Sequence, residues 1–417
     1  MAKKLLQINP VMRINTSTGR IMQEIGDIAM RNGWESYIAY SKGRDGVEKP
    51  CNSQKVPVGN KLDTIIHGLA TRFFDRHGLV SKGATKNFIK QIEEIKPDII
   101  HIHNIHGYFL NYQVLFDYLA KTDIIVVWTV HDCWLYTGHC YHYSFAKCNK
   151  WTTGCGKCPQ QRLFPASWFV DRSAQNYIDK KNAFTSISQG RLVIVPVSEW
   201  IRGEMSRSFL KDCEYRVIHN GIDLNTFTIR DTKAVKDKYG LNGKRIYLGL
   251  ASIWSTEKGW DDFMEMSKLL NDDETIVLVG VEKAKIQDLP KNVIGITRTE
   301  NIGQLAELYS AADVFVNPTW QDNYPTVNLE AISCGTPVVT YRTGGSVEAI
   351  TEQTGVVVEQ GDVNGLLNTA RDVASRGKEY YQEPCREYAL QNFKKENRYV
   401  DYLKLYDELV GRKSGKI

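Results

Sequence analysis

Short runs of β-branched and other apolar residues alternate along the chain with longer segments whose apolar residues recur at helical spacing. In the first half, the runs that we expect to form strands cover residues 3–8, 36–41, 99–104, 123–132 and 191–200. Helical patterns lie between them at residues 18–33 and 85–98, and Pro97 stops the second. Because neighbouring parallel strands need helical crossovers, this succession predicts a doubly wound α/β fold.

The second half repeats the same alternation. Its predicted strands cover residues 245–252, 275–280, 292–297, 313–319 and 337–342. We therefore expect two Rossmann-like α/β domains with doubly wound parallel sheets, facing an interdomain cleft where such sheets bind ligands. The predicted domains are residues 1–197 and 198–385, with residues 386–417 as a terminal helix that returns to the first domain.

Composition is that of an ordinary globular protein, with 42% hydrophobic and 24% charged residues among 417. The 53 Lys and Arg against 48 Asp and Glu give a net charge of +5 without a long basic block, so nucleic acid is not an expected partner. No signal peptide is recognised at the start, and no apolar run approaches the roughly 20 residues of a membrane span. We expect a cytoplasmic protein.

The stretch from Gln321 to Glu348 holds the most informative pattern. Asp322 follows a predicted buried strand, and Glu330 lies eight residues later, about a turn and a half into a helix that Pro325 opens. A loop and a helix N-terminus offer backbone N–H groups and partial positive charge to a phosphate. Carboxylates accept hydrogen bonds from vicinal hydroxyls, so the two acids could hold two sugar rings of one ligand.

This stretch resembles a known family signature: an acid, seven residues, Glu-Ala, then Gly-x-Pro-Val-Val and Gly-Gly-x-x-Glu. Further matching segments are "VIHNGIDLNTF" (217–227), "STEKGW" with its Lys-Gly, "TVHD" (129–132), "PDIIHIHNIHGYFLN", "HDCWLYTGHC" and "GCGKCP". The chain resembles the family-4 retaining glycosyltransferases, which have the GT-B fold, and within them the bacterial capsule, colanic-acid and exopolysaccharide enzymes. The resemblance covers nearly the whole chain.

The resemblance implies a role for each matching residue. Glu330 would bind the ribose of a nucleotide-diphosphate sugar, Asp322 the transferred sugar, and Lys258 the diphosphate, while His131 would act from the first domain. These four are the expected catalytic residues. The expected donor-binding residues are Ser252, Lys258, Arg298, Asp322, Asn323, Tyr324, Pro325, Thr326, Val327 and Glu330. UDP or GDP would be the nucleotide, and a saccharide, often lipid-linked, the acceptor bound by the first domain.

Two departures from the family pattern stand near this site. Asp322 replaces the usual Glu and is one methylene shorter, and Ser252, Trp254 and Ser255 stand where an Arg commonly precedes Lys258. The chain contains no Asp-x-Asp pair, so a lysine and helix dipoles would stabilise the leaving diphosphate and no catalytic metal is expected. Two carboxylates beside a sugar also suit a hydrolase, but the family motif places Glu330 on the nucleotide.

Polar residues in the first half are candidates for the acceptor side of the cleft. His131 ends a predicted strand, and His103, Asn104 and His106 follow another. The histidines could form a metal site, but a polar lining is the favoured interpretation. Thr18 and Gly19 would bring the first helix close to an acceptor or phosphate, although a simple helix cap explains them equally well.

Five of the nine cysteines lie between Cys133 and Cys158, in a predicted insertion at about residues 133–160. Cys140, Cys148, Cys155 and Cys158 include one C-x-x-C pair and could form a structural zinc site. Reduced buried cysteines or disulfides are the alternatives. Such a zinc would be the only expected metal and would not take part in the chemistry.

Two other functions compete with sugar transfer. A nucleotide-sugar epimerase or dehydrogenase would need G-x-G-x-x-G after the first strand, and "NTSTGR" lacks it. A non-catalytic, zinc-bearing protein that binds sugar nucleotides on a degenerate transferase scaffold is the second. Asp322 and the missing Arg favour it, whereas Lys258, Glu330 and His131 argue against it.

Residues 60–90 suggest a contact with an anionic membrane. Ile65, Ile66, Leu69, Phe73 and Phe74 recur as one helical face, and basic side chains flank them: Lys61, Arg72, Arg76, Lys82, Lys86 and Lys90. An apolar face with basic flanks can lie among lipid headgroups, which would place the protein at the inner face of the cytoplasmic membrane. The alternative is an amphipathic helix packed on its own domain.

Overall fold

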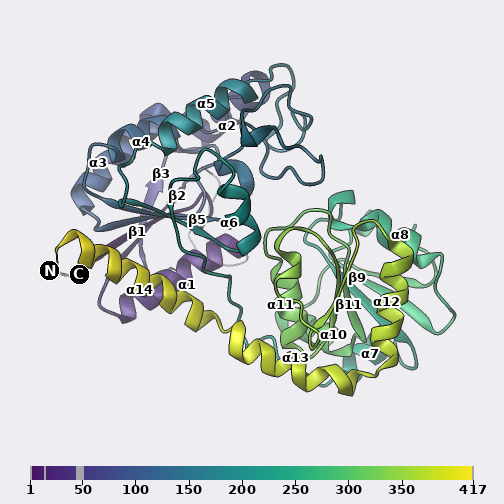
Figure 1. Ribbon diagram of the computed structural model, residues 1–417. Coiled ribbons are helices and arrows are strands. Elements are labelled where there is room, and N and C mark those ends of the chain that lie inside the picture. Colours follow the sequence, from purple (N-terminus) through teal and green to yellow (C-terminus); the bar gives the residue numbers. More distant parts are fainter. Residues whose placement is uncertain (1, 14–15, 44–50, 416–417) are drawn as a thin grey trace. The chain divides into compact units, whose positions relative to one another are not determined.

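The computed structural model describes residues 2–13, 16–43 and 51–415, which fold into two compact units. Unit 1 combines Met1–His219 with Tyr399–Ile417, and unit 2 is Asn220–Arg398. Each unit has its own parallel sheet flanked by helices (Figure 1). The prediction of two doubly wound α/β domains is confirmed.

The sheet of unit 1 has the strand order β3-β2-β1-β4-β5-β6-β7, and neighbouring strands pair in parallel. Its strands are β1 (Lys4–Ile8), β2 (Glu35–Ser41), β3 (Gln54–Val58), β4 (Ile99–Ile102), β5 (Ile125–Val130), β6 (Leu192–Pro196) and β7 (Glu214–Tyr215). The chain winds outward from β1 in one direction and then from β4 in the other. The carboxyl ends of β1 and β4 therefore form a switch point, where such sheets bind ligands.

Helices cover both faces of this sheet. One core cluster joins the sheet to α3, α4 and α5, and another joins it to α1 and α14. The helices of unit 1 are α1 (Ser17–Arg31), α2 (Lys61–Phe74), α3 (Lys82–Ile95), α4 (Tyr112–Leu119), α5 (Ser173–Phe184) and α6 (Glu199–Met205), with the 3₁₀ turns η1 (Cys133–Leu135) and η2 (Lys150–Thr152).

The last helix, α14 (Lys395–Lys413), packs on the sheet of unit 1 from Tyr399 onward. Tyr402 and Tyr406 are buried against the sheet, where their hydroxyl groups bond to Thr129 and His101 at 3.0 and 2.6 Å. Figure 1 shows α14 alongside α1. Hydrogen bonds as well as apolar packing therefore hold α14 on the first sheet.

The sheet of unit 2 has the order β10-β9-β8-β11-β12-β13, again with parallel pairings. Its strands are β8 (Arg245–Leu250), β9 (Glu274–Val279), β10 (Val293–Ile296), β11 (Val314–Asn317), β12 (Val338–Tyr341) and β13 (Gly355–Val358). Here the switch point lies between β8 and β11. Residues that follow these two strands are therefore the first candidates for a ligand site.

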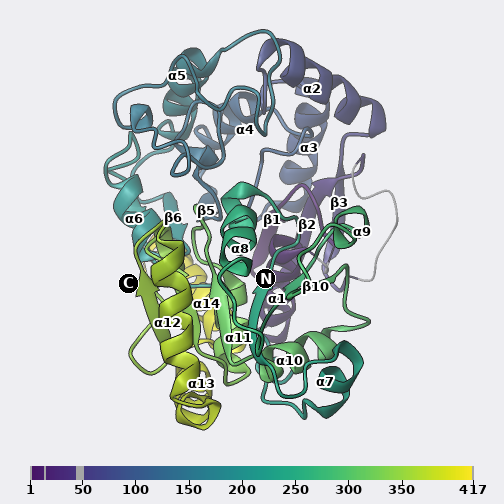
Figure 2. The ribbon, with the colours of Figure 1, turned by 90° about the vertical axis from the view of Figure 1, so that its right-hand side faces the viewer.

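The helices of unit 2 form two groups in Figures 1 and 2, with α7, α10, α11 and α13 in one and α8 and α12 in the other. They are α7 (Lys233–Tyr239), α8 (Trp260–Ser267), α9 (Lys283–Ile286), α10 (Ile302–Ala311), α11 (Thr326–Ser333), α12 (Val363–Ser375) and α13 (Lys378–Asn392), with the turns η3 (Thr256–Lys258) and η4 (Gly344–Val347). None of the described helices is long and apolar enough to cross a membrane.

The compact units end later than the predicted domains. The chain stays in unit 1 beyond residue 197, because β7 pairs with β6 and extends the first sheet. It stays in unit 2 beyond residue 385, because α13 packs against α11 and runs on to Asn392. The boundaries therefore move to residues 219/220 and 398/399.

Candidate functional site

The loop between β11 and α11 carries the acidic pair of the sequence motif. Asp322 lies in this loop, and Glu330 is the fifth residue of α11. Pro325 is the N-cap, so the helix begins at Thr326, one residue later than the sequence suggested. The motif therefore places one acid past the carboxyl end of a central strand and the other within the following helix, as predicted.

Lys258 and Asp322 are 64 positions apart in the sequence but lie side by side in the fold. The Lys258 Nζ lies 2.7 Å from Asp322 Oδ2, and the two side chains are 43% and 19% exposed. Lys258 ends η3, and Gly259 follows with a φ of +78°, where an added Cβ would lie 2.5 Å from the Pro318 carbonyl oxygen. This close approach requires glycine and holds the lysine-bearing turn against the β11 loop.

Glu330 is turned into the unit and is only 7% exposed. Its Oε2 accepts a hydrogen bond from the Tyr309 hydroxyl at 3.0 Å, and Tyr309 is fully buried in α10. Burial, followed by the neighbouring Glu330 carboxylate, raises the pKa of Tyr309. Tyr309 therefore stays a hydroxyl donor and fixes one oxygen of Glu330, which orients the carboxylate.

Buried polar contacts fix the position of the loop and of α11. Asn328 accepts from the Asn317 amide at 2.8 Å and donates to the Ser346 carbonyl at 3.1 Å, which ties α11 to β11 and η4. The Gly345 N–H donates to the Asp322 carbonyl at 3.2 Å, and the Trp320 N–H donates to the Glu257 carbonyl at 2.9 Å. The Gly-Gly part of the motif thus acts as a support for the acidic loop.

The remaining predicted donor residues lie near the same edge of the sheet. Ser252 and Arg298 follow β8 and β10 and are exposed. The loop and first helical turn hold two buried residues, Asn323 and Tyr324, and two half-buried ones, Thr326 and Val327. The sequence assigns Ser252 and Arg298 to the site, and their part in it stays a prediction.

In unit 1, His131 and His103 meet at the carboxyl ends of β5 and β4. The His103 Nδ1 lies 3.2 Å from His131 Nε2, and the His103 Nε2 lies 3.1 Å from Gln7 Oε1. Gln7 is buried within β1 and also donates to the Met22 carbonyl in α1 at 2.9 Å. A relay of side chains therefore runs from the first helix to His131, across the switch point of the sheet.

His106 and Asp132 form a second polar pair beside this relay. The His106 Nε2 lies 2.7 Å from Asp132 Oδ2, and the Trp134 N–H donates to Asp132 Oδ1 at 2.9 Å. Burial alone would raise the pKa of Asp132, but His106 and the Trp134 N–H outweigh it and lower the pKa. Asp132 therefore remains a carboxylate and holds the ring of His106 in place.

His103 and His106 contact other polar side chains, and the polar lining favoured from the sequence stays a prediction. Among residues 2–13, 16–43 and 51–415, no group of three or more His, Cys, Asp or Glu side chains is arranged to hold a metal ion as it stands. Asn104 is half-buried between His103 and His106. Thr18 lies nearby in the first turn of α1, where its hydroxyl accepts from the Asn9 amide at 3.3 Å.

Gly19 is buried, and an added Cβ would lie 2.4 Å from the Arg13 carbonyl oxygen. The close approach of the Arg13 carbonyl oxygen accounts for the glycine by packing alone. The start of α1 therefore explains why Thr18 and Gly19 stand at these positions. Binding of an acceptor by these two residues remains a prediction.

The pKa of His131 has a consequence for stability. Burial lowers it to about 4, and burial also lowers the pKa of His103 well below its ordinary value. An unfolded histidine takes up a proton near pH 6.5, so between about pH 6.5 and 4 the unfolded chain binds more protons than the folded one. The free energy of unfolding should therefore fall as the pH falls through this window.

We expect the thermal unfolding midpoint of the protein to drop from pH 7 to pH 5, and to drop less steeply for His131→Gln. Midpoints measured by circular dichroism in buffers of constant ionic strength test this. Equal slopes for the two proteins would show that His131 does not contribute.

Sequence reasoning missed the residues that hold the predicted ones in place. Gln7 was assigned only to a strand, although a polar residue inside "KLLQI" was a signal that its side chain has a buried partner. Tyr309 gave no such signal, because a tyrosine in a helix is commonly core. Its bond to Glu330 spans 21 positions and depends on how α10 and α11 pack.

Two family models match the chain, one in each half. The model described as Glycosyltransferase Family 4 matches residues 19–226, and the model described as Glycosyl transferases group 1 matches residues 244–376. WcaC of Escherichia coli K12, whose name assigns it to colanic acid biosynthesis as a glycosyl transferase, is 24% identical over 379 residues, which are 88% of this chain and 90% of WcaC.

Solved structures show the same fold at low sequence identity. Sucrose-phosphate synthase from Thermosynechococcus elongatus has a TM-score of 0.71 at 15% identity and covers 98% of this chain and 100% of its own. HepE of Anabaena, solved with UDP, has a TM-score of 0.67 at 14% identity, with 98% and 100% coverage. WcaC is thus a relative by sequence, whereas the other two support the fold.

The two doubly wound sheets, the motif around Asp322 and Glu330, and the two matched models agree with one another. They also agree with the resemblance stated from the sequence, which is confirmed. The chain belongs to the family-4 glycosyltransferases of GT-B fold, and it is a glycosyl-transferring enzyme of EC class 2.4.

Proposed function

We propose that the enzyme transfers a sugar from a nucleotide-diphosphate sugar to a saccharide acceptor, with retention of the anomeric configuration, in the synthesis of a bacterial surface polysaccharide. One observation carries this proposal. Lys258 and Asp322 lie in the turn and the loop that follow the two central strands of unit 2, and Glu330 lies within α11. This is the edge of the sheet where such folds bind nucleotides, and a cation with two carboxylates suits a sugar nucleotide.

Lys258 is the proposed partner of the diphosphate. Its bond to Asp322 joins two partly exposed side chains, and such pairs contribute only about 0–1 kcal/mol. A diphosphate dianion can therefore draw the ammonium away from Asp322, and the freed carboxylate can accept from hydroxyl groups of the transferred sugar. When the glycosidic bond breaks, the negative charge on the leaving diphosphate increases, and Lys258 stabilises it.

Glu330 is the proposed ribose partner. One carboxylate oxygen is already held by Tyr309 at 3.0 Å, so the group is oriented before the nucleotide binds. A carboxylate can accept from both ribose hydroxyls, and it gains most where water is excluded, as at this largely buried position. Asn323 to Val327 and the exposed Ser252 and Arg298 complete the proposed donor site, with Arg298 beside the base.

In unit 1, His131 is the proposed contact to the transferred sugar. It is neutral at pH 7, because its pKa is lowered to about 4, and a neutral imidazole can both donate and accept. Its Nε2 already faces His103, so the hydrogen-bond relay through His103 and Gln7 selects the ring orientation. His103, Asn104, His106, Thr18 and Gly19 form the proposed acceptor side.

The nucleotide is proposed to be UDP in the first place, with GDP as the alternative. HepE, which shares the fold, is solved with UDP and with UDP-glucose. Retention follows the family that the chain belongs to, and no catalytic metal is proposed, since Lys258 supplies the positive charge.

A panel of UDP-, GDP- and ADP-sugars tests the donor. One nucleotide class should raise the thermal unfolding midpoint of the purified enzyme, and the matching sugar donor should release its nucleoside diphosphate when an acceptor extract is added. Absence of both effects for all three classes would contradict sugar transfer and favour a non-catalytic scaffold.

The acceptor is proposed to be lipid-linked, because α2 presents its apolar face to solvent. Ile65, Ile66, Leu69, Phe73 and Phe74 are 39–59% exposed, whereas the buried residues of this helix are His67, Gly68 and Thr71. His67 anchors the helix through a 2.9 Å contact with the Ser81 hydroxyl and a bond from the Gly78 N–H at 3.0 Å. The exposure of these five side chains supports the membrane interpretation over the alternative from the sequence, that the apolar face packs on its own domain.

The loop at residues 163–170 extends this face. Phe169 is 71% exposed and stacks on Phe73 with ring centroids 5.5 Å apart, and Trp168 meets Phe73 at the same distance. A hollow of about 620 Å³ lies at the C-terminal end of α2. It is lined by Phe74, Leu79 and Val80 together with the exposed cations Arg76 and Lys82. An extended apolar surface with basic side chains at its border suits an anionic bilayer.

We expect the protein to float with anionic vesicles at low salt. Arg72, Arg76 and Lys82 changed together to Glu should release it, because attraction to anionic lipid is worth about 1 kcal/mol per cation. Phe169→Ser should weaken binding at high salt as well, where the electrostatic part is screened.

The matched control changes three exposed lysines of unit 2, Lys268, Lys283 and Lys291, to Glu and alters the net charge equally. Loss of flotation in this control as well would show that net charge alone is responsible. Failure of the wild-type protein to float would exclude lipid binding, and a dimer in sedimentation would assign the face to a second copy.

A further inference from the structure

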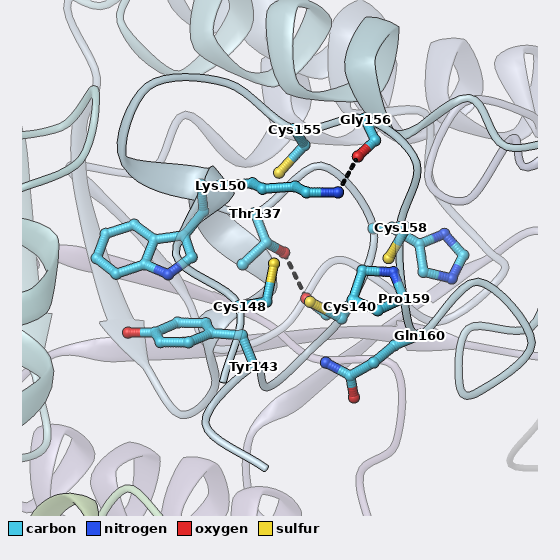
Figure 3. Close-up of a pocket in the computed structure, with 12 residues that line it drawn as sticks. Thr137, Cys140, Tyr143, Cys148, Lys150, Cys155, Gly156, Cys158, Pro159 and Gln160 are labelled. Atoms are coloured by element: carbon cyan, nitrogen blue, oxygen red, sulfur yellow. Dashed lines mark hydrogen bonds between the residues drawn. The ribbon is translucent and has the colours of Figure 1, made fainter. Parts of the chain in front are cut away.

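A small cavity in unit 1 is lined by the four cysteines singled out in the sequence. Cys140, Cys148, Cys155 and Cys158 surround it, and Figure 3 shows their side chains gathered around the same space, with Lys150 and Thr137 beside them. The cavity is small: its volume of about 10 Å³ has room for one water molecule or one ion. Nothing in the sugar-transfer chemistry uses it.

The chemistry of this lining is that of soft metal ligands. All nine cysteines of the chain are free, so the four are thiols and not disulfides. Backbone N–H groups point at two of the sulfur atoms: Gly138 donates to Cys155 Sγ at 3.1 Å, and Gln160 donates to Cys158. Thiolate sulfur is the form that binds zinc, and four cysteines that can supply it surround this one cavity.

Positive charge is buried beside the cavity. Lys180 is 1% exposed, and its ammonium donates to the carbonyls of Trp134 and Thr137 at 2.7 and 2.9 Å. No ion pair of Lys180 is recorded in the described part of the chain, although a buried ammonium is costly without negative charge nearby. One of its two acceptors is Thr137, which lines the cavity, so this cation lies next to the four cysteines.

His139 supplies a second, independent sign of a missing partner. It lines the cavity and is buried, and its Nδ1 lies 2.8 Å from Asp75 Oδ1. Its Nε2 is also buried and has no hydrogen-bond partner. The cavity therefore has, besides the four sulfur atoms, a buried polar nitrogen whose hydrogen-bonding capacity is unused.

We propose that this cavity binds one zinc ion through the thiolates of Cys140, Cys148, Cys155 and Cys158. Zinc takes four such ligands in structural sites, and the Cys155-x-x-Cys158 pair has the spacing common there. Binding releases the thiol protons to solvent and leaves a net charge of −2, which Lys180 and His139 face. The side chains as they stand do not form a metal site, so the four sulfur atoms must close on the ion.

The zinc has a structural role at the base of the exposed aromatic loop. The Cys158 N–H donates to Asp171 at 2.6 Å, and the N–H of the next residue, Arg172, donates to Asp75, which also holds His139. The loop with Trp168 and Phe169 begins and ends at this network. Closing the four cysteines on an ion therefore fixes the segment that stacks on Phe73 of α2.

Zinc content measured by plasma mass spectrometry tests the site. We expect one zinc per chain in untagged protein purified without chelators, and loss of that zinc in Cys155→Ser and Cys158→Ser. Cys51→Ser and Cys213→Ser, which change two cysteines outside the cavity, should retain it. Because a cysteine variant can fail to fold, wild-type protein produced with cobalt gives a second measurement, the absorption of cobalt bound to several thiolates.

The proposal fails if wild-type protein carries no zinc and takes up neither zinc nor cobalt. It also fails if zinc persists in Cys155→Ser and Cys158→Ser. Disulfides among these cysteines would likewise exclude it, and they would show as a loss of two hydrogens each in the intact mass of protein purified under nitrogen. Metal content and cobalt absorption do not depend on turnover, so this result is separate from the test of sugar transfer. Added EDTA should leave turnover unchanged over a short assay, since the zinc is not at the reacting atoms.

Discussion

Replacing Lys258 with alanine is expected to lower kcat by ~10²–10³-fold. The leaving nucleoside diphosphate gains negative charge as the bond to the sugar breaks, and Lys258 is the proposed cation that meets it. Asp322 would lose its 2.7 Å partner at the same time, but its carboxylate is 19% exposed and is stabilised by water. Folding should therefore change by at most about 1 kcal/mol, as expected for a partly exposed pair.

The measurement is the release of nucleoside diphosphate under saturating donor, with the unfolding midpoint of each variant as a check on folding. Lys268→Ala is the matched control, because this exposed lysine lies at the other end of α8. Lys258→Arg should recover part of the activity, since the charge remains while its geometry changes. A Lys258→Ala enzyme with nearly normal kcat would assign the diphosphate to another cation.

The central strands of both sheets were predictable because each is a continuous apolar run buried on both sides. Of the four edge strands, only β10 was predicted, at residues 292–297, and the other three were missed. β3 contains Pro57, β7 has two residues, and β13 is only Gly355–Val358. Edge strands are short and partly exposed, so their sequences carry a weak pattern. Missing β7 also moved the predicted boundary into unit 1.

The site was predictable where its residues follow a buried strand and belong to a motif, as Lys258, Asp322 and Glu330 do. Partners across the fold were not predictable. Tyr309 reaches Glu330, and Gln7 reaches His103 across 96 positions, through packing that no local pattern encodes. A motif thus identifies the groups that meet a ligand, while the groups that orient them emerge only from the tertiary structure.

Helix α2 shows a further limit of periodicity. The apolar face of α2 was read correctly from the sequence, but periodicity does not say whether such a face points to the core or to solvent. His67 decides it here, because its two ring nitrogens find partners inside the unit at Ser81 and Gly78. The polar side of the helix is therefore the buried one.

Replacing Glu330 with alanine is expected to remove nucleotide binding almost completely. A ribose that loses a bidentate acceptor in a largely buried site loses about 2–4 kcal/mol, which is roughly 30- to 700-fold in Kd. Glu330→Ala also leaves the buried Tyr309 hydroxyl without its acceptor, which can cost about 1–3 kcal/mol of stability. The loss of binding must therefore be separated from a loss of folding.

Two further variants make that separation. Tyr309→Phe removes the same hydrogen bond but keeps the carboxylate, and Glu330→Gln keeps an acceptor for Tyr309 but can no longer accept from both ribose hydroxyls. If Glu330 binds the ribose, calorimetric titration with the nucleoside diphosphate should show a large loss for Glu330→Gln and a small one for Tyr309→Phe. Similar losses in the two variants would mean that the pair only holds α10 against α11, and normal affinity in folded Glu330→Gln would remove Glu330 from the donor site.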